Sequence, residues 1–315
     1  MCIFGSVDMY NLWYKHNRYE YRARQTDAIY DTLHYTILFS KVYVGMILII
    51  TVLVLILVVI YTFFRKQRKD RNYDYKCFLL TVKDQKERQE RFFKSHHENV
   101  PIETIYGVDT RIVKYANEFE EQIDPDYFEK AVEMHYNPDI KRPDITYFNM
   151  GAIGCFFGHM EFYKRCFDQG LKYAVIFEDN VIVKSNTLYD EIQSVIDEKG
   201  DDFEMCFFHC LSRLPDKKEG TLEKVKWISS TKCYLVHVDN MRKYIKHFYP
   251  MDNHVDMKHE DLITKGARVY YKDLREYIFI DRTHKSMIGH NDHGRREFFS
   301  RQYPEATPDD VKWGY

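Results

Sequence analysis

Three strongly polar residues interrupt a stretch that otherwise resembles the interior of a protein. In KYAVIFEDNVIV, residues 172–183, the apolar run 173–177 is followed by Glu178, Asp179 and Asn180 before apolar residues resume. Oxygen ligands of this kind hold Mg²⁺ or Mn²⁺, and such an ion can neutralise charge that grows on a leaving diphosphate. The alternative is a capped turn with solvated side chains, which is the commoner role of an isolated Glu-Asp-Asn sequence.

Alternating strand and helix patterns place this triplet at the end of a strand. Strand patterns at 76–82 and 102–109 flank a helix pattern at 84–97, and an amphipathic helix pattern at 149–170 precedes the strand at 173–177. This alternation predicts an α/β domain with a mostly parallel central sheet. An unbroken apolar run fits a central strand that is covered on both faces. Because ligands of such sheets bind outside the carboxyl ends of the strands, we expect the triplet to face a ligand crevice.

An uncharged apolar segment, VYVGMILIITVLVLILVVIYTFF, occupies residues 42–64. About 20 apolar residues suffice for a helix to cross the hydrocarbon core of a bilayer, and this segment lacks the polar face of a soluble helix. We therefore predict a transmembrane helix. A cleaved signal peptide is disfavoured because the run begins far from the N-terminus and is too long. The predicted organisation is an N-terminal tail (1–41), a membrane helix (42–64), a basic linker (65–74), a large domain (75–290) and a C-terminal tail (291–315).

Charge and cysteine content restrict the function further. Basic residues crowd the C-terminal flank of the apolar segment, at 65–71, which by the positive-inside rule places the large domain in the cytosol. The absence of any Asn-x-Ser/Thr acceptor fits that side. A formal charge of -2 argues against a strongly basic nucleic-acid binder. The seven cysteines lack disulfide-framework spacing. Cys206, His209 and Cys210 offer a metal-binding possibility, but buried reduced thiols are the favoured interpretation.

Several blocks of the chain resemble glycosyltransferase family 25, which includes lipooligosaccharide galactosyltransferases and collagen hydroxylysine galactosyltransferases. The opening block resembles the family's INLDRRPERRE pattern, with Arg88 in the place of an arginine. The further blocks are VDT (108–110) for VDG, GAIGCFFGH (151–159) for GEIGC-x-x-SH, FEDNV (177–181) for LEDDV, and 233–256 for AYLIS…GA-x-x-L…P-x-D. The resemblance covers about 76–261, with the blocks in the family's order.

The resemblance implies a GT-A-like nucleotide-sugar-binding fold and a UDP-sugar donor, most often UDP-galactose. It also implies Mn²⁺ or Mg²⁺, and an inverting transfer to a hydroxyl of a glycan or protein acceptor. We therefore expect a membrane-anchored hexosyltransferase of glycan biosynthesis, with residues 75–290 as its glycosyltransferase domain. The collagen-modifying relatives suggest the ER or Golgi lumen as the alternative location. Two departures, Asn180 for an acidic residue and Gly158 for a serine, keep a non-catalytic relative or a structural membrane protein open as alternatives.

The expected site residues fall into three groups. The metal set is Glu178, Asp179 and Asn180, with Asp179 expected on the surface; the donor or acceptor set is Arg88, Asp109, Gly151, Gly154 and His159; the general base is Asp256 or Asp252, with Glu260 and Asp261 as second choices. The glycines would allow close backbone approach, and the base would remove the proton of the acceptor hydroxyl. The alternatives are a surface helix arginine for Arg88, a turn residue for Asp109, a core histidine for His159 and a polar loop for the aspartates.

Overall fold

The computed structural model describes residues 6–69, 72–96, 100–137, 148–283 and 312–313. The chain divides into two compact units, residues 1–71 and residues 72–315. Most of the predicted C-terminal tail lies outside the described residues.

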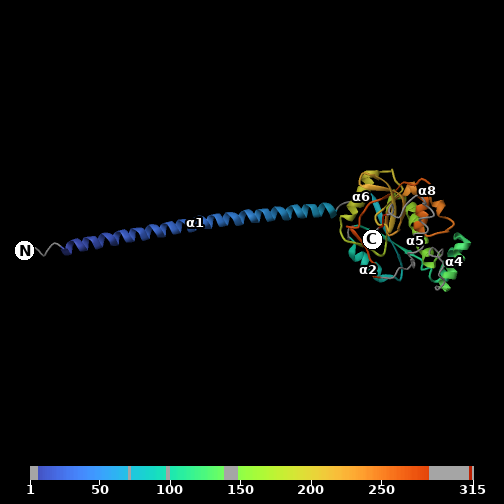
Figure 1. The fold of residues 1–315 in the computed structure, drawn as a ribbon, viewed down its shortest axis with the longest axis horizontal. Coiled ribbons are helices and arrows are strands. Elements are labelled where there is room, and N and C mark those ends of the chain that lie inside the picture. Colours follow the sequence, from blue (N-terminus) through green and yellow to red (C-terminus); the bar gives the residue numbers. More distant parts are fainter. Residues whose placement is uncertain (1–5, 70–71, 97–99, 138–147, 284–311, 314–315) are drawn as a thin grey trace, which may run out of the picture. The chain divides into compact units, whose positions relative to one another are not determined.

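The described part of the first unit is one long helix, α1 (Ser6–Lys69), which includes the predicted membrane segment, residues 6–41 of the predicted tail and residues 65–69 of the predicted linker (Figure 1). Its segment Thr32–Thr62 has a mean hydropathy of 3.2 and is not buried within the protein, so it is no core helix. Its 31 residues would extend about 46 Å at a rise of about 1.5 Å per residue, which exceeds the thickness of the hydrocarbon core. Length and composition are those of a membrane anchor or a signal sequence.

The second unit is built on a nine-stranded sheet of order β11-β6-β7-β9-β5-β8-β3-β1-β2. Its strands are β1 (Tyr75–Val82), β2 (Ile102–Gly107), β3 (Tyr173–Glu178), β5 (Met205–Phe207), β6 (Ser212–Glu219), β7 (Leu222–Ser229), β8 (Cys233–His237), β9 (Val269–Tyr271) and β11 (Lys312–Trp313). The pairings give β2, β1, β3, β5, β9 and β6 one direction, and β8, β7 and β11 the other. The predicted α/β fold with a mostly parallel sheet is confirmed in this form, with the antiparallel β8 between β3 and β5.

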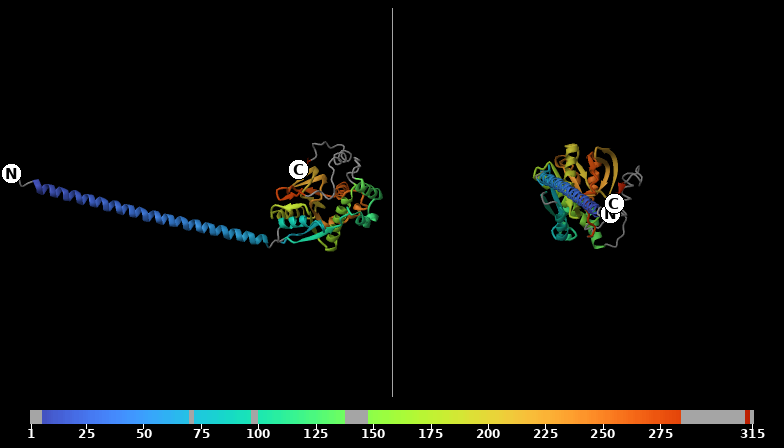
Figure 2. Two further views of the ribbon diagram at one scale, coloured as in Figure 1. Left: turned by 90° about the horizontal axis from the view of Figure 1, so that it is seen from below. Right: turned by 90° about the vertical axis from the view of Figure 1, so that its left-hand side faces the viewer.

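Helices gather around this sheet (Figure 2). They are α2 (Lys86–Ser95), α3 (Val113–Ala116), η1 (Asn117–Gln122), α4 (Pro125–Tyr136), α5 (Met150–Asp168), α6 (Leu188–Lys199), α7 (Val238–Arg242), η3 (Ile245–Phe248) and α8 (Val255–Thr264), and a small two-stranded sheet joins β4 (Val181–Val183) to β10 (Ile278–Ile280). The prediction of a central strand at 173–177 is confirmed: β3 lies between β8 and β1, and all of its residues are buried.

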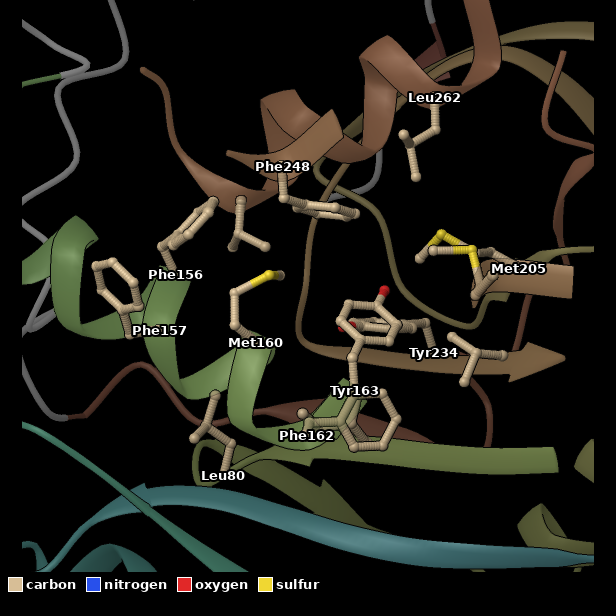
Figure 3. Packing of buried hydrophobic residues seen from close by; sticks show 14 of the residues in the cluster. Leu80, Phe156, Phe157, Met160, Phe162, Tyr163, Met205, Tyr234, Phe248 and Leu262 are labelled. Carbon is tan, nitrogen blue, oxygen red and sulfur yellow. The ribbon is translucent and has the colours of Figure 1, made fainter. Parts of the chain in front are cut away.

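Burial on both faces explains the unbroken apolar runs of the central strands. Successive side chains of β1 alternate between two cores: Phe78 and Leu80 belong to one, and Cys77 and Leu79 to the other. The first core lies under α5 and α8, and the second lies under α2 and α6. Figure 3 shows part of the first core, in which Phe162 and Tyr163 of α5 lie beside Tyr234 of β8.

Two glycines of α5 allow this helix to lie close to the strand ends. A Cβ atom at Gly154 would come within 2.4 Å of the Val108 carbonyl oxygen and 2.7 Å of Thr110 Oγ1. A Cβ atom at Gly158 would meet the side chain of Leu80 at 2.7 Å. Gly158, which replaces a serine of the family pattern, is therefore a packing residue beside β1. Gly154 brings the loop after β2 against the helix, and thereby shapes the site described next.

Candidate active site

A cleft with a volume of about 100 Å³ opens at the carboxyl ends of the parallel strands β1, β2 and β3. Seven of the ten predicted site residues line it, from four segments of the chain: Arg88, Asp109, Gly151, Gly154, Glu178, Asp179 and Asn180. This is the edge at which α/β sheets bind ligands. His159, Asp252 and Asp256 do not line the cleft.

Asp179 is buried in an ion pair, which corrects the expectation of a surface carboxylate. Its Oδ1 accepts a hydrogen bond from Arg88 Nη1 at 2.9 Å, and its Oδ2 accepts one from Thr81 Oγ1 at 2.7 Å. The side chains of Arg88 and Asp179 are only 9% and 8% exposed. Burial raises the pKa of Asp179, against the opposing effects of Thr81 and Arg88. Arg88 is therefore no surface helix arginine; the exposed i,i+4 pair of α2 joins Arg91 to Glu87 instead.

Glu178, which is buried, forms a second ion pair, with the partly buried Lys232. Lys232 Nζ donates to Oε2 at 2.5 Å, and Thr231 Oγ1 donates to Oε1 at 2.6 Å. Burial alone would raise the pKa of Glu178, but the charge of Lys232 and the hydrogen bonds lower it to about 2. Burial likewise favours the neutral amine of Lys232, but the carboxylate of Glu178 outweighs it and raises the pKa of Lys232. Both groups are therefore charged at neutral pH.

The sequence did not predict Lys232, which lines the cleft, or Thr231, which donates a hydrogen bond to Glu178. They belong to the three-residue loop 230–232 between β7 and β8, and the Lys232 carbonyl accepts a hydrogen bond from the Glu178 backbone N–H at 2.8 Å. A lysine before an apolar strand is common at protein surfaces, so the local pattern carried no signal. The placement of β8 beside β3 brings this loop to the cleft.

Asn180 contributes the one amide of the predicted metal set. Its Oδ1 is buried and has no hydrogen-bond partner among the described residues. Together with the flanking carboxylates of Glu178 and Asp179, it offers the oxygen ligands that a hard divalent cation prefers. The residues thus fit such a cation in chemical type, although Lys232 and Arg88 already bring positive charge to both carboxylates.

The loop after β2 forms the opposite wall of the cleft. Asp109 is paired with Arg111 through two contacts of 2.7 and 2.6 Å, and this guanidinium lowers the pKa of Asp109. Thr110 fastens the loop to α5: its hydroxyl donates to the Met150 carbonyl and accepts from the Gly154 backbone N–H. Asp109 is thus both a turn residue and a residue of the cleft wall.

The charges of the cleft are balanced. Its lining contains three cations, Arg88, Arg111 and Lys232, and three anions, Asp109, Glu178 and Asp179. Each cation is paired with one of these carboxylates.

His159 lies outside the cleft as a fully buried histidine. Its Nδ1 is 2.7 Å from the Tyr234 hydroxyl, and burial lowers the pKa of His159 to about 4, so its ring is neutral at physiological pH.

Ligand atoms of Cys155, His159 and Glu178 lie within 4.8 Å of one another. Burial raises the pKa of the Cys155 thiol, and Glu178 is already held by Lys232. Among the described residues, Cys206, His209 and Cys210 do not form such a cluster.

The two candidate bases have different environments. The side chain of Asp252 is 56% exposed and its carboxylate pairs with Lys258 Nζ at 2.6 Å. Asp256, in the first turn of α8, is buried and accepts a hydrogen bond from Ser229 Oγ at 3.1 Å. Of the second choices, Glu260 is buried, and burial raises the pKa of Asp261.

A model of one protein family, described as Glycosyltransferase family 25 (LPS biosynthesis protein), matches residues 74–259. No curated protein matches the chain. Similar solved structures include mannose-1-phosphate geranyltransferase from Thermus thermophilus (10% identity, covering 66% of this chain and 75% of that one, TM-score 0.29), UTP-bound UGPase from Acinetobacter baumannii (8%, 74% and 95%, TM-score 0.36) and apo mouse xyloside xylosyltransferase 1 (8%, 73% and 82%, TM-score 0.31). Likeness at this level carries no argument about function.

The buried pair of Asp179 and Arg88 gives a prediction about stability. Asp179→Ala should lower the free energy of unfolding by about 3–5 kcal/mol, because it leaves the Arg88 charge buried without its partner. Adding Arg88→Met should recover most of this loss. Glu87→Ala, which breaks the exposed pair on the same helix, should stay within about 0.5 kcal/mol of the wild type. Urea unfolding of the full chain in detergent measures all four proteins, and equal losses in Asp179→Ala and Glu87→Ala would contradict the prediction.

Proposed function

The chain belongs to glycosyltransferase family 25, and from this membership we propose that it transfers a hexose, galactose in the first place, from a UDP-sugar to a hydroxyl of a glycan or protein acceptor with inversion. The observation that carries the proposal is the cleft itself. Residues from four segments of the matched region converge at the carboxyl ends of β1, β2 and β3, where a nucleotide would bind in a sheet of this kind.

The parts of the donor correspond to different walls of this cleft. The nucleoside lies along the loop after β2, where Asp109 can accept hydrogen bonds from ribose or base and Gly154 permits close backbone approach. The diphosphate lies toward the end of β3, where Arg88 is fixed by Asp179. A divalent cation held by Asn180, Glu178 and Asp179 would supply positive charge beside the diphosphate.

The general base is Asp256 in this proposal. A base must come within about 2.6–3.2 Å of the acceptor hydroxyl in the bound complex. Asp256 is buried, and a hydrogen bond from Ser229 Oγ at 3.1 Å orients its carboxylate. Asp252 is exposed, and its carboxylate forms an ion pair with Lys258. We therefore favour Asp256 over Asp252 as the base.

A donor screen tests the proposed function. The full chain in detergent with Mn²⁺ should hydrolyse one UDP-hexose faster than the other UDP-sugars, UDP-galactose being the first candidate, as measured by release of UDP. Binding of UDP-sugars without turnover would identify a non-catalytic relative. Failure to bind any nucleotide sugar would reject the function and favour a structural role.

The assignment of the base makes a second prediction. Asp256→Asn keeps the shape of the side chain but removes its basicity, so kcat should fall by about 10²- to 10⁴-fold, with donor binding nearly unchanged. Asp252→Asn is the matched control and should retain the wild-type kcat. Wild-type kcat in Asp256→Asn together with a large loss in Asp252→Asn would transfer the role to Asp252, and wild-type rates in both would reject the pair.

We further propose that Thr32–Thr62 anchors the chain as a single-pass membrane protein with residues 72–315 in the cytosol. The basic residues that follow the apolar segment support this orientation. Protease added to sealed microsomes should then digest the C-terminal domain. Protection of that domain would place it in the lumen of the ER or Golgi, and loss of the apolar segment from the mature chain would identify a signal sequence.

A further inference from the structure

Lys232 is a partly buried cation of the cleft that no part of the proposed mechanism uses. It lines the cleft at the end of β3, and its side chain is 15% exposed. An ammonium group carries three N–H donors, and among the described residues the ammonium of Lys232 makes one hydrogen bond, to Glu178 Oε2 at 2.5 Å. Two donors therefore remain for a ligand in the cleft.

The other two cations of the cleft are guanidinium groups, each in an ion pair of its own. Arg111 holds Asp109 through two contacts, and Arg88 holds an Asp179 carboxylate that Thr81 fixes from its other oxygen. Lysine, in contrast, carries a compact charge on a flexible stem and can turn between neighbouring acceptors. Glu178 would keep its hydrogen bond from Thr231 if Lys232 turned away.

Charge balance leads to the same residue. The six charged side chains of the cleft sum to zero, three positive and three negative. The diphosphate of a nucleotide sugar adds negative charge, which needs a cation able to leave or share its present partner. Lys232 meets this requirement because its flexible side chain has one hydrogen bond to share, and Glu178 keeps its bond from Thr231.

We infer, resting on the proposed function, that Lys232 binds the diphosphate of the nucleotide-sugar donor and stabilises the leaving group. When the bond between the anomeric carbon and the phosphate oxygen breaks, its electron pair stays on that oxygen, and the Lys232 ammonium compensates the added charge while keeping its proton. The acceptor oxygen forms the new bond to the anomeric carbon and loses its proton to the general base, so the reaction is balanced.

Binding of UDP and of uridine tests this inference, since the two ligands differ by the diphosphate alone. Calorimetric titration of the full chain in detergent with Mn²⁺ should show that Lys232→Met weakens UDP binding by about 10- to 100-fold, which is the loss expected for a hydrogen bond to a charged group. Uridine binding should be unchanged. Lys232→Arg, which keeps the charge, should retain part of the UDP affinity.

Lys199 provides the matched control. Its side chain is 10% exposed and paired with Glu219 at 2.7 Å, away from the cleft, so Lys199→Met should bind UDP like the wild type. Should Lys232→Met fail to fold because Glu178 loses its partner, Glu178→Gln and Glu178→Gln/Lys232→Met are compared instead. The double variant should bind UDP more weakly than the single variant by a similar factor.

Each outcome separates the inference from the function on which it rests. If Lys232→Met binds UDP as tightly as the wild type, the role of Lys232 is overturned while the proposed function stands. The same holds if Glu178→Gln and the double variant bind UDP with equal affinity. An equal loss of UDP and uridine affinity would also overturn it, since that result assigns Lys232 to the shape of the cleft. A wild-type chain that binds neither ligand rejects the proposed function itself.

Discussion

The rest of the site depends on one constraint: the two buried carboxylates at the end of β3 each need a positive charge beside them. Removing a carboxylate from water costs several kcal/mol unless a cation and hydrogen bonds replace the lost hydration. Glu178 and Asp179 are only 9% and 7% exposed. Each therefore needs a cation, and the two cations come from segments far apart in the chain: Arg88 on α2 and Lys232 before β8. The pairs thus fix the position of α2 and of the 230–232 loop relative to β3.

The same constraint ties the fold to its ligand edge. The register pairs Leu80 of β1 with Glu178 of β3 and Val82 with Gly107 of β2, so three chain exits lie side by side. A loop leaving β2 could turn away from the others, but Thr110 and the bare backbone of Gly154 hold it against α5. Backbone packing on one side and ion pairs on the other side therefore shape the cleft before any ligand binds.

Local sequence patterns predicted the elements of this arrangement better than its contacts. The apolar run at 173–177 marked β3 as a central strand because both of its faces are buried, and the polar triplet after it lines the cleft at the carboxyl end of that strand. The pairing of Arg88 with Asp179 joins residues 91 positions apart, and an arginine in an amphipathic helix carries no sign of such a partner. Lys232 was missed for the same reason. The insertion of the antiparallel β8 beside β3 depends on packing across the sheet, which periodicity along one strand does not encode.

Asn180 keeps the charges of the cleft balanced because its amide side chain is neutral. An aspartate at that position, as in the family pattern, would give the cleft four anions against its three cations, and the excess negative charge would require a bound cation or a proton. The neutral amide lets Arg88, Arg111 and Lys232 balance the cleft by themselves. In the proposed function, a divalent ion would then be needed only when the donor brings its diphosphate, and the inferred role of Lys232 is to share that charge. The amide at 180 and the lysine at 232 are thus complementary: one lowers the negative charge of the cleft before the donor binds, and the other supplies positive charge to the donor once it is bound.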